Sequence, residues 1–191
     1  MPADLPVVEF ATRAEWATWL AAEHAASAGV WLKIARKDGG AESVSYSDAL
    51  DVALCHGWID GQKDRLDERF WLQRFTPRTP RSRWSKRNRE RAEALIGSGE
   101  MAPAGTREIE RARADGRWEA AYDSHSTATV PDDLQAELDR NAAAREFFAA
   151  LDSTNRYAIL YRIQEARRPD TRARRIAKYV AMLSEGRRIH E

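Results

Sequence analysis

Short runs of apolar residues with polar neighbours predict four strands in the first half of the chain. Residues 7–10 and 30–35 have the length and the β-branched and aromatic content of strands. Two further runs, at 58–66 and 69–75, are separated by the acidic pair at 67–68, where we expect a turn. The last two runs therefore predict a pair of antiparallel strands.

Apolar residues three and four positions apart predict helices between these strands. Thr12 and Glu15 have the spacing of a capping box, in which each side chain bonds the backbone of the other residue. They predict a helix to about residue 26. Ser45 or Ser47 is placed to cap a second helix, because a serine hydroxyl accepts from the free amides of a first turn.

Glycine, proline and serine mark the elements that follow. Gly57 is expected to end the second helix. Two prolines within 76–80 predict a loop, because proline lacks the N–H that the interior of a strand or helix uses. Ser85 is expected to cap a strongly basic helix to about residue 96, and a further helix is predicted at 103–114.

The second half of the chain has a helical pattern throughout, after a small, polar stretch at 124–131 that predicts a linker. Asn141 and Ser153 are placed as helix caps, and Pro169 is expected to separate the last two helices. The predicted helices span about 132–139, 142–151, 154–167 and 171–185.

The order of these elements predicts an α+β fold. Residues 1–123 are expected to form a small, mainly antiparallel sheet with flanking helices, and this domain carries the candidate site. Residues 124–131 are the expected linker. Residues 132–191 are expected to form a helical C-terminal unit packed on the first domain.

The charge of the chain is balanced overall but unevenly placed. Its 191 residues have a net charge of +1, so no overall field favours nucleic acid or membranes. Residues 38–68 hold eight acids and two bases, whereas residues 69–91 hold nine bases and one acid. We therefore expect a basic stripe at 69–91, and residues 167–178 form a second one.

Cysteine and histidine usage limits the chemistry. Cys55 is the only cysteine, which excludes an intramolecular disulfide, and the four histidines show no metal-ligand spacing. We therefore expect no metal and no cofactor. The first ten residues lack the basic and apolar regions of a secretory signal, and the longest apolar runs reach five residues. A cytoplasmic protein without membrane insertion is expected.

The glycine-flanked segment 55–61, together with the basic stripe after it, gives the strongest indication of a binding site. Arginine binds carboxylate or phosphate through its planar fork, tryptophan offers a stacking surface, and a helix start offers amides. These groups predict a pocket for a small anionic or aromatic ligand, or for an acidic segment of a partner protein. The expected lining is Trp58, Asp60, Arg74, Arg78, Trp84, Ser85 and Asn88, with Cys55, His56 and Trp118 as additional candidates.

Asp60 and Cys55 each have a structural interpretation beside the functional one. Asp60 precedes a glycine, so it is expected either to cap its own turn or to pair with Arg74 or Arg78. A nucleophilic Cys55 needs a base within hydrogen-bond reach, and on a helix the adjacent His56 points about 100° away. A small buried core residue is the other interpretation of Cys55.

Several short motifs follow one another in order along nearly the whole chain. They are residues 55–61 (CHGWIDG), 74–78 (RFTPR), Trp84-Ser85 with Asn88, 99–101 with Pro103 and Gly105, 115–118 (DGRW) with Ala121-Tyr122, Ala166, 171–172 and 175–176. Together they resemble the YdeI/OmpD-associated family, whose members are often labelled bacteriocin-protection proteins.

The resemblance implies a soluble bacterial protein with a role in stress or bacteriocin protection. It brings no catalytic residue with it, because the family name reflects associations and not a demonstrated reaction. Two positions depart from the family pattern. His56 stands where an aromatic such as phenylalanine is common, and 167–170 reads Arg-Arg-Pro-Asp where a lysine is usually followed by acidic residues.

Three functions are therefore open. The leading one is a binding protein that uses the pocket described above. A nucleic-acid-binding module would use the stripes at 69–91 and 167–178, which would have to share one face and bind in a salt-sensitive way. The third is an enzyme that would use Cys55, His56 or Asp60, and a Cys55 buried in the core with no imidazole nearby would exclude it.

Overall fold

The computed structural model describes residues 5–124, 127–166 and 168–190. It divides the chain into two compact units, each with its own hydrophobic core. The units are residues 1–84 with 88–121 (unit 1), and residues 85–87 with 122–191 (unit 2). The domain and linker boundaries expected from the sequence stay predictions, and residues 125–126 of that linker lie outside the described part of the chain.

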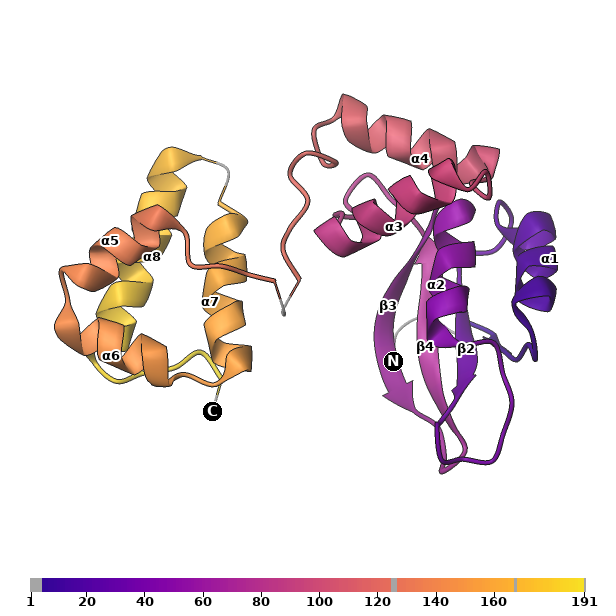
Figure 1. Cartoon of the computed structure of the whole chain (residues 1–191), viewed down its shortest axis with the longest axis horizontal. Coiled ribbons are helices and arrows are strands. Elements are labelled where there is room, and N and C mark those ends of the chain that lie inside the picture. The colour runs from indigo at the N-terminus through magenta and orange to yellow at the C-terminus, as the bar shows by residue number, and fades with distance from the viewer. Residues whose placement is uncertain (1–4, 125–126, 167, 191) are drawn as a thin grey trace. The chain divides into compact units, whose positions relative to one another are not determined.

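The described residues of unit 1 form a four-stranded sheet. Its strands are β1 (Val7–Val8), β2 (Val30–Ala35), β3 (Trp58–Arg65) and β4 (Phe70–Pro77), in the order β1-β2-β4-β3. β1 runs parallel to β2, whereas β2 and β3 are both antiparallel to β4. The predicted α+β class with a mainly antiparallel sheet is confirmed (Figure 1).

Two helices of unit 1 cover one face of this sheet. The helices in this half of the chain are α1 (Arg13–Glu23), α2 (Tyr46–Cys55), α3 (Lys86–Gly97) and α4 (Pro103–Ala114). The ring of Trp16 on α1 lies 5.8 Å from that of Phe75, and the ring of Tyr46 on α2 lies 5.9 Å from that of Trp71. Because side chains four residues apart on a strand share a face, α1 and α2 pack on the same side of β4.

Local signals set the ends of these helices. Thr12 and Glu15 form the predicted capping box at α1. Ser45, and not Ser47, caps α2, and its hydroxyl accepts from the Asp48 N–H at 3.1 Å. Gly57 follows α2 with a φ of +73°, a conformation that costs glycine little and other residues more.

The core of unit 1 lies between the sheet and these helices. In β2, buried and half-buried positions alternate, as the period of a strand requires. Its buried side chains belong to the same core as Trp16, which is fully buried and donates from Nε1 to the Ala49 carbonyl at 3.1 Å. The core includes Trp16, Leu20, Val30, Leu32, Leu50, Leu54, Trp58 and Phe75.

Strand β4 runs further than the sequence predicted. A loop was expected at 76–80, but Thr76 and Pro77 still pair with Ile59 and Trp58. Pro77 is the last residue of the strand, where its missing N–H interrupts no further ladder. The loop prediction is therefore wrong for these two residues.

The described part of unit 2 is helical. Its helices are α5 (Asp132–Asp139), α6 (Ala142–Ala150), α7 (Ser153–Gln164) and α8 (Pro169–Ser184). Asn141 caps α6 as predicted, with Oδ1 3.0 Å from the Ala144 N–H. Asp152, and not Ser153, caps α7, because its carboxylate reaches the N–H groups that need an acceptor.

Pro169 begins α8 and does not stand between two helices as expected. Proline is well suited to this first position, where its N–H would have no partner in the helix. Apolar faces of the helices meet in a core that includes Leu134, Leu138, Phe148, Ile159, Ile163 and Leu183.

Candidate functional site

The segment after α2 and the RFTPR motif, which the sequence assigned to one site, lie side by side. Trp58 pairs with Pro77 across the β3–β4 ladder. One residue further, the Arg78 N–H donates to the Gly57 carbonyl at 3.0 Å. The sheet therefore brings these two pieces of the candidate site together.

The three candidate tryptophans lie inside the core. Trp58, Trp84 and Trp118 are 0%, 2% and 5% exposed. Trp58 donates from Nε1 to the His24 carbonyl at 3.1 Å, and the ring centroids of Trp84 and Trp118 lie 4.8 Å apart. A ligand cannot stack on these rings unless the core opens, so they serve packing in this structure.

Arg78 is also buried, at 5% exposure, and its guanidinium packs on an aromatic ring. Its Cζ lies 3.5 Å from the ring centroid of Trp84, and Nη1 donates to the Arg83 carbonyl at 3.2 Å. These contacts tie the loop after β4 to the core by cation–π attraction and hydrogen bonding.

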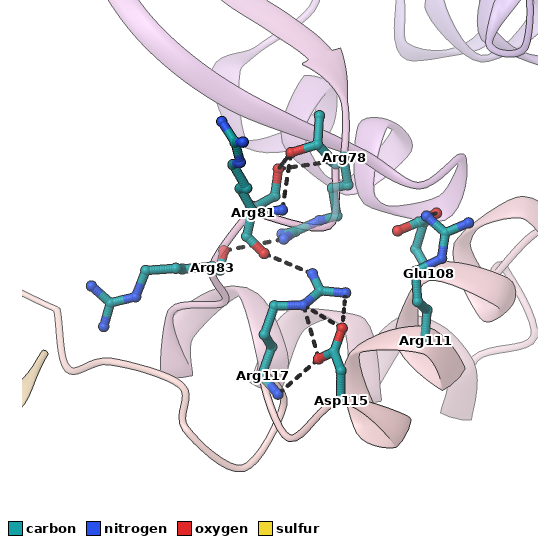
Figure 2. Close-up of polar contacts among 9 residues, drawn as sticks. Arg78, Arg81, Arg83, Glu108, Arg111, Asp115 and Arg117 are labelled. Carbon is teal, nitrogen blue, oxygen red and sulfur yellow. Dashed lines mark hydrogen bonds and ion pairs between the residues drawn. The ribbon is translucent and has the colours of Figure 1, made fainter. Parts of the chain in front are cut away.

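Arg117 holds the same loop from the other side (Figure 2). Its Nη1 donates to the Ser82 carbonyl at 2.8 Å, and its Nε and Nη2 both lie 2.8 Å from Asp115 Oδ2. Figure 2 shows the guanidinium groups of Arg81 and Arg83 extending away from this cluster. The buried guanidinium groups of the motif region thus organise a loop.

Asp60 and Arg74 keep part of their surface accessible. Asp60 Oδ2 accepts from the Tyr46 hydroxyl at 2.7 Å, a partner that the sequence did not indicate. Arg74 lies beside Gly61, where an added Cβ would come no closer than 3.8 Å to the arginine. Asp60 is therefore anchored to α2 through a neutral hydroxyl.

Ser85 and Asn88, expected at an anion-binding helix start, are each 9% exposed. Ser85 precedes α3 and forms an isolated parallel bridge with Tyr122. The adjacent Lys86 N–H donates to the Tyr122 carbonyl at 2.8 Å. At least one amide at the start of α3 is thus bonded within the chain.

A cavity of about 390 Å³ opens in unit 1 beside two of the additional candidates. Small or apolar side chains from α1 and α2 form most of its wall, and charged or polar groups stand among them. We call it the α1–α2 cavity. It is lined by Arg13, Ala14, Ala17, Val52, Cys55, His56 and Glu100.

An ion pair between Arg13 and Glu100 crosses the lining of the α1–α2 cavity. Both side chains are 44% exposed. The Ser98 hydroxyl donates to Glu100 Oε1 at 2.8 Å, and this bond, followed by that from Arg13, lowers the pKa of Glu100. Glu100 is therefore ionised at neutral pH and presents a negative charge beside the arginine.

Cys55 contributes an uncharged side chain to the wall of this cavity. Burial, reinforced by the charge of Glu100, raises the pKa of its thiol to about 11. Because the thiolate and not the thiol is the nucleophile, Cys55 is unreactive at neutral pH.

His56 has an imidazole neighbour that the sequence did not predict. The rings of His24 and His56 have centroids 5.5 Å apart. His24 follows α1 and His56 follows α2, and each Nδ1 lies within 3.0 Å of the carbonyl four residues earlier in its own helix.

Sequence reasoning missed most of the cavity lining. Arg13, Ala14, Ala17 and Val52 carried no signal beyond helical periodicity, because only the packing of α1 against α2 brings them together. Glu100 did carry a sequence signal, because it lies within the 99–101 motif.

Many side chains of the two basic stripes have acidic partners. Arg91 lies 3.3 Å from Asp51, and Arg175 lies 3.6 Å from Glu165. The stripes fall mainly in different units, Arg167 lies outside the described residues, and a shared face stays a prediction. Further pairs join Lys86 to Asp123, Arg89 to Glu93 and Arg172 to Asp133.

Within residues 5–124, 127–166 and 168–190, no group of three or more His, Cys, Asp or Glu side chains is arranged to hold a metal ion. In the same part of the chain, no helix combines the length and the apolar character that crossing a bilayer requires.

Comparison with known families matches both halves of the chain. Residues 8–108 match a domain of unknown function (DUF8412), and residues 127–186 match the family described as bacteriocin-protection, YdeI or OmpD-associated. No curated protein and no solved structure matches significantly.

The first match covers more than half of the 191 residues, and the second covers the helical unit. The chain thus joins an α+β domain to a helical one. It belongs to the DUF8412 family, whose model covers most of the α+β part. The helical part matches the YdeI/OmpD-associated, bacteriocin-protection family that the motifs indicated, although the motifs extended this resemblance over nearly the whole chain and the match covers residues 127–186.

Proposed function

We propose that this chain is a binding protein that holds a small molecule in the α1–α2 cavity. The ligand has an apolar body and a carboxylate or similar anionic end. The observation that carries the proposal is the cavity itself, whose volume of about 390 Å³ falls within the range of about 300–1,000 Å³ that small-molecule sites occupy.

The apolar part of the ligand is assigned to the wall formed by Ala14, Ala17, Val52 and the neutral thiol of Cys55. Burying apolar ligand surface there contributes roughly 25 cal/mol per Å² before the costs of association. The wall contains no ionised group that would have to be desolvated.

The anionic end is assigned to Arg13 on the lining. Arg13 is already paired with Glu100, and a ligand carboxylate would replace Glu100 as the partner of Arg13. The Arg13–Glu100 pair is 44% exposed on both sides, so separating it costs little compared with a buried pair.

This proposal keeps the binding function expected from the sequence and changes its location. Cys55 and His56, the additional candidates, become lining residues. Trp58, Trp84 and Arg78 support the fold, because their buried surfaces are already engaged. Several arginines of the basic stripes are paired with acids, which argues against a nucleic-acid-binding module. The raised pKa of the Cys55 thiol argues against an enzyme that uses Cys55 as its nucleophile.

The description of the matching helical family connects its members with bacteriocin protection and OmpD. We extend a protective role to this chain as part of the proposal. Ligand capture in unit 1 would be the molecular activity behind that role.

The test is a thermal-shift screen with small aromatic and aliphatic carboxylates, each beside its uncharged amide. A ligand that binds only the folded chain raises its stability by RT ln(1 + [L]/Kd), about 2.7 kcal/mol at a hundredfold excess over Kd. We expect carboxylates to stabilise the protein more than amides. Ala17→Trp, which fills the cavity, should abolish the shift, whereas Ala22→Trp on the exposed face of α1 should preserve it.

Arg13→Gln tests the assignment of the anionic end. It should remove the preference for carboxylate over amide, with Arg107→Gln, an exposed arginine on α4, as the matched control. Stabilisation that persists in Ala17→Trp, or a carboxylate preference that persists in Arg13→Gln, would contradict the proposal.

A further inference from the structure

We propose that His24 and His56 together bind one divalent transition-metal ion, of which Zn²⁺ is the example tested below. This site shares His56 with the lining of the α1–α2 cavity, but it needs no ligand in that cavity. It rests on three features of the pair, namely the tautomer of each ring, the distance between the rings, and the rigidity of the backbone that carries them.

The hydrogen bonds of the two rings leave the metal-binding nitrogen available. His24 Nδ1 lies 2.9 Å from the Leu20 carbonyl, and His56 Nδ1 lies 3.0 Å from the Val52 carbonyl. A carbonyl only accepts, so each Nδ1 donates, and in the tautomer that metals bind, each ring has its lone pair on Nε2. Histidines that bind metals commonly donate their other N–H to such a carbonyl, which sets the tautomer and the ring orientation.

Neither Nε2 has a hydrogen-bond partner among the residues that the structure describes, and both rings are half-buried. An acceptor nitrogen without a partner at a half-buried position is open to a Lewis acid. Imidazole nitrogen suits Zn²⁺, Cu²⁺ and Ni²⁺ among the divalent ions.

The distance between the rings fits a shared ion. With metal–nitrogen bonds of about 2.0–2.1 Å and near-tetrahedral angles, two imidazoles on one ion place their centroids about 5 Å apart. The centroids of His24 and His56 are 5.5 Å apart, and the rings are inclined by 55°.

The backbone that carries the two histidines is held in place. The His24 carbonyl accepts from Trp58 Nε1 at 3.1 Å, and Trp58 is fully buried. The His56 N–H donates to the Ala53 carbonyl at 3.1 Å, and Gly57 turns the chain directly afterwards. The pair is therefore largely pre-arranged, which reduces the ordering cost of binding an ion.

Two histidines fill two positions of a four-coordinate ion. Within the described residues no third His, Cys, Asp or Glu joins them, so water would complete the coordination.

The experiment is a calorimetric titration of the full-length, EDTA-treated protein with Zn²⁺ alone in a non-chelating buffer. We expect one Zn²⁺ per chain at this pair. His24→Asn and His56→Asn each remove Nε2, while the asparagine amide can take the place of Nδ1 and keep the bond to the helix carbonyl. Each variant should weaken binding at least about tenfold.

His190→Asn, at an exposed histidine in unit 2, is the control and should leave the affinity unchanged. Thermal unfolding of each variant in EDTA shows that it is folded. In addition, ¹⁵N NMR of the imidazoles should show Zn²⁺ shifting both Nε2 resonances while both Nδ1 atoms stay protonated. The proposal is overturned if Zn²⁺ does not bind, if binding survives both substitutions, or if it depends on His190.

Discussion

Cys55 and His56 follow each other in the chain, yet the end of α2 turns them into different environments. Cys55 is 5% exposed, with a pKa raised to about 11 by burial and by Glu100. His56 is half-buried and meets the ring of His24. At the scale of single residues, two adjacent side chains therefore differ in chemistry because their surroundings differ. The thiol of Cys55 is unreactive, whereas the imidazole of His56 is the one that we propose binds a metal ion.

The state of Cys55 can be measured by its reaction with iodoacetamide. An unperturbed thiol has a pKa of about 8.5, so the folded protein at pH 8 should react at least about 100-fold more slowly than the protein unfolded in guanidinium. The rate of the folded protein should rise with pH towards about 11, because the thiolate fraction rises until the pH reaches the pKa. Equal rates for folded and unfolded protein would show an activated, accessible cysteine.

At the scale of elements, the close approach of α4 to the end of α2 positions the wall of the α1–α2 cavity. Gly105 lies in the first turn of α4. A Cβ at this position would come within 2.5 Å of the Cys55 carbonyl oxygen and 2.7 Å of the Leu54 carbonyl oxygen. Such distances are shorter than van der Waals contact, so only glycine fits without moving one of the helices.

Gly105→Ala should therefore destabilise the protein by about 1–3 kcal/mol, the usual cost of overpacking a buried contact. The matched control is Gly97→Ala in α3, where an added Cβ would meet nothing within 4 Å. It should be neutral or stabilising by up to about 1 kcal/mol, because alanine favours helix more than glycine does. Chemical denaturation measures both, and similar values for the two variants would contradict this packing argument.

Local patterns predicted most of these elements, and the errors have local reasons. β2 and α2 have the expected type and place because alternation and capping act within a few residues. The cap of α7 is Asp152 and not the predicted Ser153, because two adjacent residues could both supply the capping oxygen. The extension of β4 to Pro77 depended on pairing with β3, which no local signal contains.

At the scale of the whole molecule, the chain contains two hydrophobic cores that share no residue. One core is built around Trp16 and Trp58, and the other around Leu138 and Ile159. The first family match falls mainly on unit 1, and the second falls on unit 2. Because the two cores are separate, we expect a large-to-small substitution in one core to destabilise only the unit that contains that core.

Leu138→Ala, at a residue that is 1% exposed in α5, should destabilise unit 2 by about 2–5 kcal/mol. Hydrogen exchange should then quicken in α5 to α8 and remain unchanged in α2. Leu50→Ala, at a residue that is 2% exposed in α2, should have the reverse effect. Equal loss of protection in both units from either substitution would indicate a single cooperative core.

The candidate site could be predicted only in part, because its lining depends on contacts between residues that are far apart in the sequence. Cys55, His56 and the motif around Glu100 drew attention in the sequence, whereas Ala14 and Ala17 are ordinary helix residues until α2 packs beside them. Trp58 and Arg78 had the chemistry of ligand-binding residues, but long-range packing placed them in the core.

The sequence by itself determined the α+β class, the position of most strands and helices, and the resemblance to the family that matches residues 127–186. These properties follow from local periodicity, capping and ordered motifs, which act between near neighbours. Only the tertiary structure decided which polar groups are buried, where the cavity opens, and that the rings of His24 and His56 lie next to each other. Those properties arise from contacts between helices whose residues are far apart in the chain, and no local pattern encodes them.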